Sequence, residues 1–454
     1  MTQATLWFAN ALLAEGWARD VRLELADGRI AGIATGVAAA PGDDRHAIGL
    51  PGLPNLHSHA FQRAMAGLTE VRGPEGDSFW TWRELMYRFV ERLGPEQVEA
   101  VAAMAFLEML ETGFTRVGEF HYLHHDVGGA AFANPAEMAE RVAAAADETG
   151  IGLTLLPVFY AHAGFGGQAP TEGQRRFLST PDSYARLLEG SRVAVGKLAG
   201  GKVGVAPHSL RAVTEAELAE ITSGASGPIH IHIAEQIREV EDCQAWSGAA
   251  PVEWLLDRFP VDGRWCLIHA THMTSSETQR LARSGAVAGL CPITEANLGD
   301  GLFPAPAFLA AGGAFGVGSD SNVRIDAAEE LRTLEYGQRL AHRSRNVLAS
   351  EAGRSTGAEL YRRALIGGAR ALGEVEHAGL AVGGPADLVS LSADHADLAA
   401  RDGDAWLDSL VFARGAGAID GVWRAGRQVV EQGRHRARSR IVARYRAALE
   451  GLVQ

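Results

Sequence analysis

The chain has 454 residues, 47% of them hydrophobic and 21% charged, which is enough for one large domain and a smaller appended one. Its 42 Lys and Arg against 55 Asp and Glu give a formal charge of -13, which argues against nucleic acid or an anionic membrane as a partner. The three cysteines form no CxxC pair, and the chain has neither a signal-peptide pattern nor an apolar run near the ~18 residues that span a bilayer. We therefore expect a reduced, cytoplasmic protein.

Strand-like segments at the two ends of the chain predict one small β-domain. Residues 4–36 alternate short apolar runs with turn residues, and Asp27-Gly28 is a strong hairpin signal. Similar composition, with turns bounded by glycine, returns at 384–392 and at 421–435. We expect these segments to assemble into a single β-sandwich-like domain.

Between the ends, apolar β-rich runs alternate with Ala, Leu and Glu-rich stretches of helical period, as in repeated βα units around a parallel sheet. The candidate strands lie at 50–59, 114–122, 151–160, 201–209, 228–235, 265–273, 286–294 and 314–322. Eight such runs over about three hundred residues are typical of a (β/α)8 TIM-type barrel. Catalytic groups in that α/β fold lie where the strands end, so the strand-terminal residues are the candidates for a site.

The predicted organisation has three parts. Residues 1–50 and 376–436 form the small β-domain, 51–375 form the barrel, and 437–454 form a C-terminal helix. The basic stretch 434–446 has no aromatic platform and lies in an acidic protein, so a solvated helix face or a subunit contact is favoured over a nucleic-acid patch.

Histidines at strand ends predict a metal site. Successive side chains on a strand alternate faces, so His57 and His59 can reach one ion, and His232 and Asp320 end two later strands. A single HxH pair is weak evidence, and Asp320 alone also fits a turn aspartate that caps a helix. His230 faces the same way as His232 but lies deeper, so we expect it to be a packed residue. Together these ligands favour Zn2+ with an open position for water, although iron or manganese fits the same atoms.

Two further strand-end groups are placed to move protons. Glu235 lies three residues beyond His232, and His269 ends the next strand. Neither is needed as a ligand. Hydrolysis requires such groups once the metal has lowered the pKa of its water from ~15.7 toward ~7.

The motifs PGLPNLHSH, HIHIAE, LIHATH and GSDSN resemble the amidohydrolase superfamily, in the branch of cytosine deaminase, guanine deaminase and the triazine hydrolases. The resemblance covers nearly the whole chain and implies a (β/α)8 barrel, a His ligand set with Asp320, and a homodimer. Binuclear members carry a lysine or glutamate at the end of strand four. Here that strand begins at Lys202 and ends at His208, so the resemblance implies one zinc ion per chain.

The segments HAFQRAMAG, SFWTWRELMY, GEFHYLHH and APHSLRAV resemble, more specifically, the formimidoylglutamate deiminase family of bacterial histidine degradation. This resemblance implies substrate contacts at Gln62, Arg83, Tyr122, His208 and Arg211. The substrate is a dicarboxylate, and an acidic protein needs fixed cations to hold it. Arginine pairs bidentately with carboxylate, so Arg83 and Arg211 suit this role.

The resulting hypothesis is zinc-dependent hydrolysis of N-formimidoyl-L-glutamate to N-formyl-L-glutamate and ammonia. Zinc-activated water attacks the formimidoyl carbon, His269 and Asp320 share the removal of its proton, and Glu235 protonates the departing nitrogen. Which of His269 and Asp320 is the primary base stays open. The alternatives are a deaminase or dechlorinase of a neutral heterocycle and a non-catalytic assembly protein on a dead barrel, which usually lacks the metal ligands found here.

Overall fold

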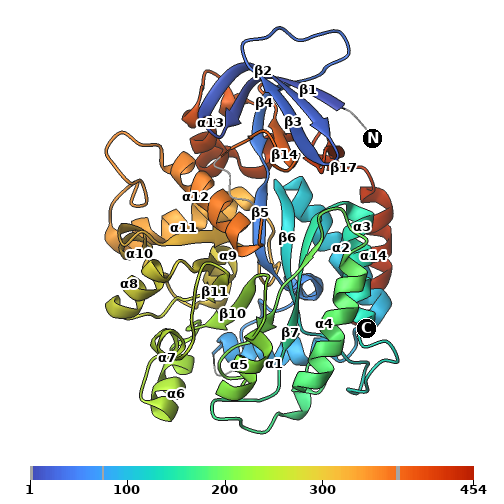
Figure 1. Ribbon diagram of the computed structural model, residues 1–454, viewed down its shortest axis with the longest axis vertical. Helices are drawn as coiled ribbons and strands as arrows, with labels where there is room; N and C mark the ends of the chain where they lie inside the picture. The colour runs from blue at the N-terminus through green and yellow to red at the C-terminus, as the bar shows by residue number, and fades with distance from the viewer. Residues whose placement is uncertain (1–3, 74–75, 375–378, 454) are drawn as a thin grey trace.

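A computed structural model describes residues 4–73, 76–374 and 379–453 of the chain. A β-sheet domain lies at one end of the molecule and a barrel of strands and helices lies below it (Figure 1). This arrangement confirms the predicted α/β fold class. The predicted boundary at 375/376 and residues 1–3 lie outside the described residues.

The small domain is a single eight-stranded sheet built from both ends of the chain, with strand order β17-β16-β15-β14-β4-β1-β2-β3. The two ends meet where β14 pairs antiparallel with β4, which places Leu388 opposite Pro51. The strands are β1 (Ala4–Leu13), β2 (Gly16–Ala26), β3 (Arg29–Ala34), β4 (Asp44–Pro51), β14 (Leu388–Leu391), β15 (Ile419–Arg424), β16 (Arg427–Glu431) and β17 (Arg434–His435).

Two-residue hairpins join several of these strands. Asp27 and Gly28 connect β2 to β3 with φ of 51° and 77°, so both central residues are left-handed as a type I′ turn requires. Ala425 and Gly426, at 49° and 72°, do the same between β15 and β16. The hairpin predicted from Asp27-Gly28 is therefore confirmed.

The barrel strands form two hydrogen-bonded arcs, β5-β6-β7-β8 with β9 on β7, and β10-β11-β12-β13. Single bridges close the barrel, at Ser58–Asp320 on one side and at Val205–Ile229 and Ser209–His232 on the other. The strands are β5 (Leu53–Ser58), β6 (Phe114–His121), β7 (Gly152–Phe159), β8 (Lys202–Val203), β9 (Ala206–Pro207), β10 (Ile229–Ile233), β11 (Trp265–His269), β12 (Val287–Leu290) and β13 (Ala314–Val317).

The predicted fourth strand, 201–209, is divided into β8 and β9. The backbone changes its hydrogen-bond partner between them, because Gly204 N donates to Leu155 O and Val205 N donates to Pro228 O. A Cβ at Gly204 would lie 2.6 Å from Pro228 O, so glycine permits this close approach.

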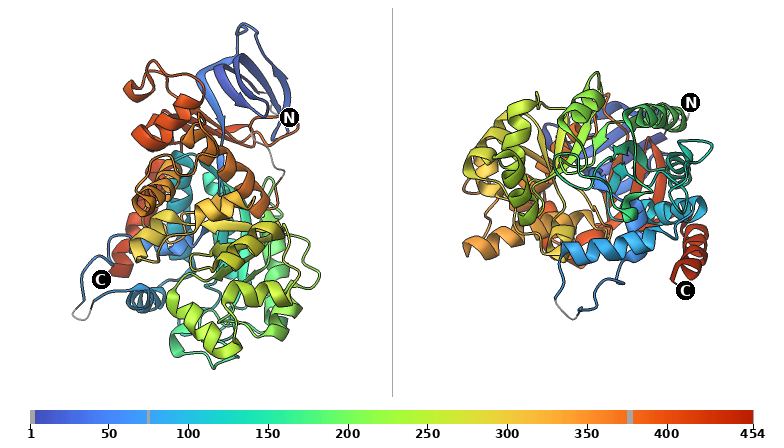
Figure 2. Two further views of the ribbon diagram at one scale, coloured as in Figure 1. Left: turned by 90° about the vertical axis from the view of Figure 1, so that its left-hand side faces the viewer. Right: turned by 90° about the horizontal axis from the view of Figure 1, so that it is seen from below.

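Helices surround the barrel strands, as the view from below shows (Figure 2). Several begin at a threonine N-cap: Thr180, Thr214 and Thr274 each accept a hydrogen bond from the N–H three residues later. The α-helices are α1 (Phe79–Val90), α2 (Pro95–Glu111), α3 (Glu137–Thr149), α4 (Pro181–Val195), α5 (Glu215–Thr222), α6 (Ile237–Ser247), α7 (Pro251–Arg258), α8 (Ser275–Ser284), α9 (Pro292–Leu298), α10 (Ala305–Ala310), α11 (Ala327–His342), α12 (Thr356–Ala371), α13 (Asp404–Ser409) and α14 (Arg438–Val453).

Short 3-10 or π turns complete the described structure. They are η1 (Ala60–Met65), η2 (Glu172–Gln174), η3 (Ala396–Leu398), η4 (Leu410–Arg414) and η5 (Gly415–Ala418). No helix in the described part of the chain has the length and apolar character needed to cross a bilayer. All three cysteines are free and buried.

The basic stretch near the C-terminus uses its charges within the chain. Arg440 pairs with Glu148 at 3.1 Å and Arg444 with Glu99 at 3.1 Å, so α14 is tied to α2 and α3 by ion pairs. Arg438 pairs with Glu111 of α2 in the same way. Three of the arginines in this stretch therefore form ion pairs within the chain.

Candidate active site and metal centre

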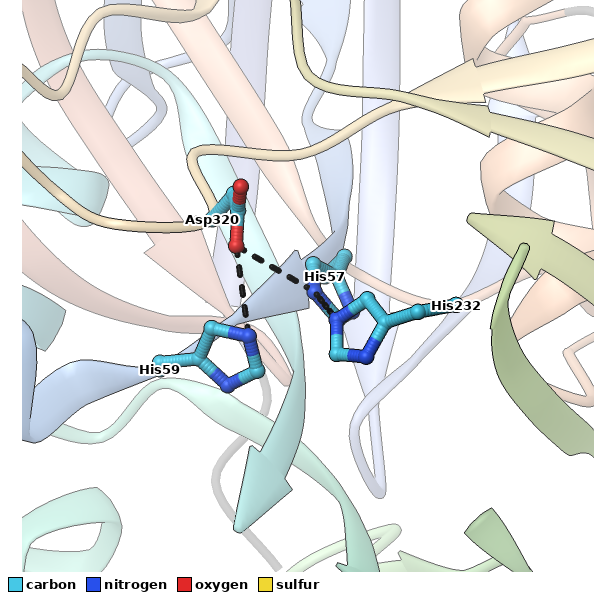
Figure 3. A group of neighbouring side chains, drawn as sticks. All are labelled: His57, His59, His232 and Asp320. Carbon is cyan, nitrogen blue, oxygen red and sulfur yellow. Dashed lines mark hydrogen bonds and ion pairs between the residues drawn. The ribbon is translucent and has the colours of Figure 1, made fainter. Parts of the chain in front are cut away.

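Four buried side chains converge at the end of the barrel strands. His57 and His59 lie at the end of β5, His232 lies on β10, and Asp320 follows β13 (Figure 3). Asp320 Oδ1 lies 3.3 Å from His57 Nε2 and 3.3 Å from His59 Nε2, and His57 Nε2 lies 3.1 Å from His232 Nε2. Three imidazole nitrogens and a carboxylate oxygen around one point form the donor set of a divalent metal ion.

Hydrogen bonds behind two of the imidazoles orient them for a metal. His59 Nδ1 lies 2.8 Å from Phe120 O, and His232 Nδ1 lies 3.0 Å from His208 O. Each Nδ1–H donates to a carbonyl, so each Nε2 keeps its lone pair toward the centre of the cluster. Burial lowers the pKa of His57 to about 3 and lowers the pKa of His59 and His232 as well. Neutral imidazoles are the form that binds metal, so these residues fit the ion.

A buried polar network holds Asp320 in place. Asp320 has a φ of 46°, a left-handed conformation that is costly for a residue with a Cβ. Asn322 Nδ2 donates to Asp320 O at 3.0 Å and to Ser58 Oγ at 3.1 Å. Ser319 Oγ donates to Asn322 Oδ1 and accepts from Asn55 Nδ2, both at 2.6 Å. The network therefore fixes the carboxylate relative to the histidines of β5.

A second cluster beside the ligands can move protons. His269, at the end of β11, places Nε2 3.6 Å from Glu235 Oε1 and 3.8 Å from Asp320 Oδ2, while Nδ1 lies 3.2 Å from Glu295 Oε1. Burial lowers the pKa of His269, but Glu235, Glu295 and Asp320 outweigh it and the pKa is raised. Burial raises the pKa of Glu235. Burial also raises that of Asp320, but the neighbouring histidines bring it below its ordinary value.

The pocket outside these groups is lined by two arginines and three tyrosines. Arg83 comes from α1 and Arg211 from the loop after β9. Within the described residues, neither guanidinium forms an ion pair or a hydrogen bond with a protein group, and the Nε atoms of both are buried without a partner. Arg83 instead packs over the Trp80 ring, 4.5 Å from its centroid. Arg211 is buried and Arg83 is half-buried, and two cations without a carboxylate partner in one pocket favour an anionic ligand.

The structure brings the sequence-predicted residues together. Every residue predicted for the site lines this pocket, apart from the fully buried ligand His57. His230 is buried and its Nε2–H donates to the Ala371 carbonyl oxygen at 2.7 Å, which confirms that it is a packed residue.

Sequence reasoning missed several residues at or behind the pocket. Tyr160 is the last residue of the third predicted strand and Glu295 follows the seventh, so the strand-end rule gave a signal for both. Tyr87, Phe177 and Asp300 lie on a helix or in long loops, and no local pattern identifies them. Their positions depend on how distant segments pack.

Residues 48–429 match the amidohydrolase family, and residues 5–47 match the N-terminal domain of formimidoylglutamate deiminase HutF. The chain belongs to the amidohydrolase family. It is 53% identical to a formimidoylglutamate deiminase from Pseudomonas aeruginosa over 96% of this chain and 97% of the relative.

Solved structures agree with this assignment. The crystal structure of an amidohydrolase from Brucella melitensis has a TM-score of 0.95 and 54% identity, and it covers 100% of both chains. An adenosine deaminase from Xanthomonas campestris with bound zinc has a TM-score of 0.82 at 23% identity, and covers 99% of this chain and 98% of its own. At that identity the likeness shows the fold alone.

Proposed function

We propose that this protein hydrolyses N-formimidoyl-L-glutamate to N-formyl-L-glutamate and ammonia, a step of histidine degradation. One observation carries the proposal: a single pocket has a metal site at its inner end and two unpaired guanidiniums, Arg83 and Arg211, in its wall. The metal site serves hydrolysis of a C–N bond, and the two guanidiniums match the two carboxylates of a glutamate derivative. The formimidoylglutamate deiminase from P. aeruginosa supports the same substrate.

The proposed metal is one zinc ion per chain, held by His57, His59, His232 and Asp320. When bound, the ion lowers the pKa of a water molecule and so supplies a nucleophile near neutral pH. The zinc in the related adenosine deaminase structure supports this choice over iron or manganese.

The position of Lys202 supports a single ion. Its ammonium group contacts Gly373 O and pairs with Glu374 at 3.1 Å, so it is engaged with groups that are not part of the metal site. Two further groups of possible ligand atoms both include His269. One consists of His269, Cys291 and Asp320, and the other of His269, Glu235 and Asp300. Metal analysis of the purified protein tests the proposal, and two equivalents that are both required for turnover would contradict it.

Three protein groups would handle protons. We propose Asp320 as the primary base, because its carboxylate lies among the metal ligands, next to where a bound ion would hold water, and its lowered pKa keeps it ionised. His269 has a raised pKa and lies between carboxylates, so as an imidazolium it balances their charge and hydrogen-bonds the developing tetrahedral centre. Glu235, whose pKa burial raises, can carry a proton to the departing nitrogen.

The remaining predicted contacts would position the substrate. Gln62 Nε2 donates to Tyr122 Oη at 2.8 Å, and the Tyr122 hydroxyl donates to the weak acceptor Met86 Sδ at 4.0 Å, which a stronger acceptor on a ligand can replace. The rings of Tyr122 and His208 lie 5.7 Å apart, and both side chains line the pocket between the metal ligands and the arginines. We propose a small dicarboxylate as the only class of substrate, and a cytoplasmic homodimer as the working form.

Ammonia release from purified protein tests the function. The panel contains formimidoylglutamate, formimidoylaspartate, guanine and cytosine at equal concentration. We expect formimidoylglutamate to be preferred. Two arginines spaced for glutamate cannot hold both carboxylates of the shorter substrate while its reacting carbon lies at the metal site. Preference for either heterocycle would support the alternative deaminase and contradict the proposal.

A further inference from the structure

Tyr160 is a pocket residue outside the set of contacts named so far. It follows the end of β7, is 4% exposed and lines the pocket that holds both arginines. Its ring packs against His208, with 4.6 Å between centroids, and against Phe177 at 5.9 Å. The ring is therefore held in place by packing, and its hydroxyl group is the part of the side chain that can hydrogen-bond a ligand.

A glutamine fixes the role of this hydroxyl group. Gln174, in η2, is buried, and its Oε1 accepts the Thr171 N–H at 2.8 Å. The amide NH2 must therefore be the end that faces Tyr160, and it donates to Tyr160 Oη at 2.7 Å. The tyrosine oxygen acts as an acceptor in this bond. Its own proton is left for another acceptor, and the hydroxyl group of Tyr87, which also lines the pocket, is the protein neighbour within reach.

The same arrangement occurs on the neighbouring strand. Gln62 Nε2 donates to Tyr122 Oη at 2.8 Å, just as Gln174 does to Tyr160. The two tyrosines follow the ends of β6 and β7, which are adjacent in the barrel, and both line the pocket. The Tyr122 hydroxyl donates at 4.0 Å to Met86 Sδ, which is only a weak acceptor. Both tyrosines can therefore direct a hydroxyl donor at an acceptor-rich ligand.

The electrostatic surroundings of Tyr160 fit an anion. Burial and Tyr87 raise the pKa of Tyr160, and they outweigh the charges of Arg211 and Arg83, which lower it. The hydroxyl group therefore stays protonated, yet it lies within the field of both guanidiniums. A neutral donor in the same pocket as two cations strengthens the binding of a carboxylate without adding charge.

Two arginine side chains join the segment that follows Tyr160 to α1, the helix that carries Arg83. Arg176 is fully buried and donates to His125 O at 3.0 Å, to Leu93 O at 2.8 Å and to Val90 O at the end of α1. Arg175 pairs with Glu91, one residue beyond α1. These contacts keep Tyr160 and α1 in a fixed relation, as a binding site for a small ligand requires.

We infer that Tyr160, oriented by Gln174, donates a hydrogen bond to a substrate carboxylate and helps the pocket to select dicarboxylates. The inference rests on the proposed function for the identity of the substrate. It adds a specificity-determining residue to the contacts of Arg83 and Arg211.

The first test is Tyr160→Phe, which removes the hydroxyl group and keeps the ring against His208. We expect KM for formimidoylglutamate to rise and kcat/KM to fall about ten- to a hundredfold, the usual worth of a hydrogen bond to a charged group. Metal content and kcat should change little. The matched control is Tyr184→Phe, which removes a buried hydroxyl bonded to Pro157 O at 2.8 Å and away from the pocket. An unchanged KM in a folded, metal-replete Tyr160→Phe protein would overturn the inference.

The second test changes the orientation of the hydroxyl group. In Gln174→Glu one carboxylate oxygen still accepts the Thr171 N–H, and the other draws the Tyr160 proton away from the pocket. We expect KM to rise as it does for Tyr160→Phe, with no further rise when both substitutions are combined. A Gln174→Glu effect that persists unchanged in the Tyr160→Phe background would mean that the new charge acts directly, and would contradict the proposed orientation.

The third test separates this inference from the proposed function. Calorimetric binding of glutarate to the metal-loaded protein needs no turnover, and Tyr160→Phe should weaken it by a similar factor. Parental protein that binds glutarate but releases no ammonia from formimidoylglutamate would contradict the proposed function alone. Equal glutarate affinity in the parental and Tyr160→Phe proteins would contradict the inference alone.

Discussion

The two ends of the pocket are built in different ways. At the metal end His57, His59 and His232 lie on or directly after buried barrel strands, and their backbones are fixed by the parallel ladder. At the carboxylate end Arg83 lies on α1, and Arg211 lies in a loop after β9. The barrel thus holds the groups proposed to react, while helices and loops outside it hold the groups proposed to select the substrate. Changes at one end should therefore leave the other end intact.

The largest expected effect is at the metal end. Asp320→Asn removes a proposed ligand and the proposed primary base while keeping the shape of the side chain. We expect loss of metal together with a fall in kcat of about four orders of magnitude or more, the upper range for general acid–base groups. Metal analysis and ammonia release measure the two effects. Asp326→Asn, an N-cap of α11 where asparagine serves equally well, is the control that should retain both. Full metal content in the Asp320→Asn protein would show that Asp320 is not a metal ligand.

The next effect separates proton carriers from ligands. Glu235→Gln and His269→Asn should keep the metal and lower kcat by roughly two to four orders of magnitude. Glu241→Gln, an exposed glutamate on α6, should behave like the parental protein. A metal-replete Glu235→Gln enzyme with parental kcat would show that another group protonates the departing nitrogen.

A smaller effect is expected at the carboxylate end. Arg211→Met leaves one substrate carboxylate without its cation, a loss of about 2 to 5 kcal/mol for buried charge pairs. The value of kcat/KM should then fall at least about thirtyfold, with metal content unchanged. The exposed Arg186→Met is the control. If Arg211→Met also loses metal, the two ends are coupled and the comparison between them fails.

The smallest effect concerns a carboxyl group buried under the metal end. Glu119 Oε1 accepts the Ala60 N–H at 2.6 Å, and burial raises the pKa of Glu119 from 4.5 to about 8. A raised folded-state pKa means that the stabilising contribution is complete below the unfolded-state pKa and is lost as the pH rises through about 8. Glu119→Gln stays neutral at every pH and escapes this loss.

We therefore expect the melting temperature of Glu119→Gln, relative to the parental protein, to rise by a few degrees between about pH 5 and about pH 8. Thermal unfolding of the metal-loaded proteins at several pH values measures the difference. A difference that stays constant over this range would show that Glu119 has the same protonation state folded and unfolded.

Much of the fold and of the metal end could be read from local sequence. The alternation of side chains along a strand places His57 and His59 on one face, and strand ends in a barrel meet at one rim, which brings in His232 and Asp320. The Asp27-Gly28 turn follows from the backbone conformations that these two residues tolerate. These features depend on residues within one element or on a rule of the fold, so a single sequence carries them.

Tertiary structure alone decided the rest. The pairing of β4 with β14 joins segments more than three hundred residues apart, and the division of the fourth strand depends on Pro228 from the next unit. The orientation of Tyr160 depends on Gln174, and the position of its loop depends on Arg176 meeting the end of α1. Such contacts arise from the packing of distant segments, and no periodicity in the chain encodes them. The sequence by itself determined which atoms could bind a metal, and the packing of loops and helices determined that the Tyr160 side chain lines the pocket.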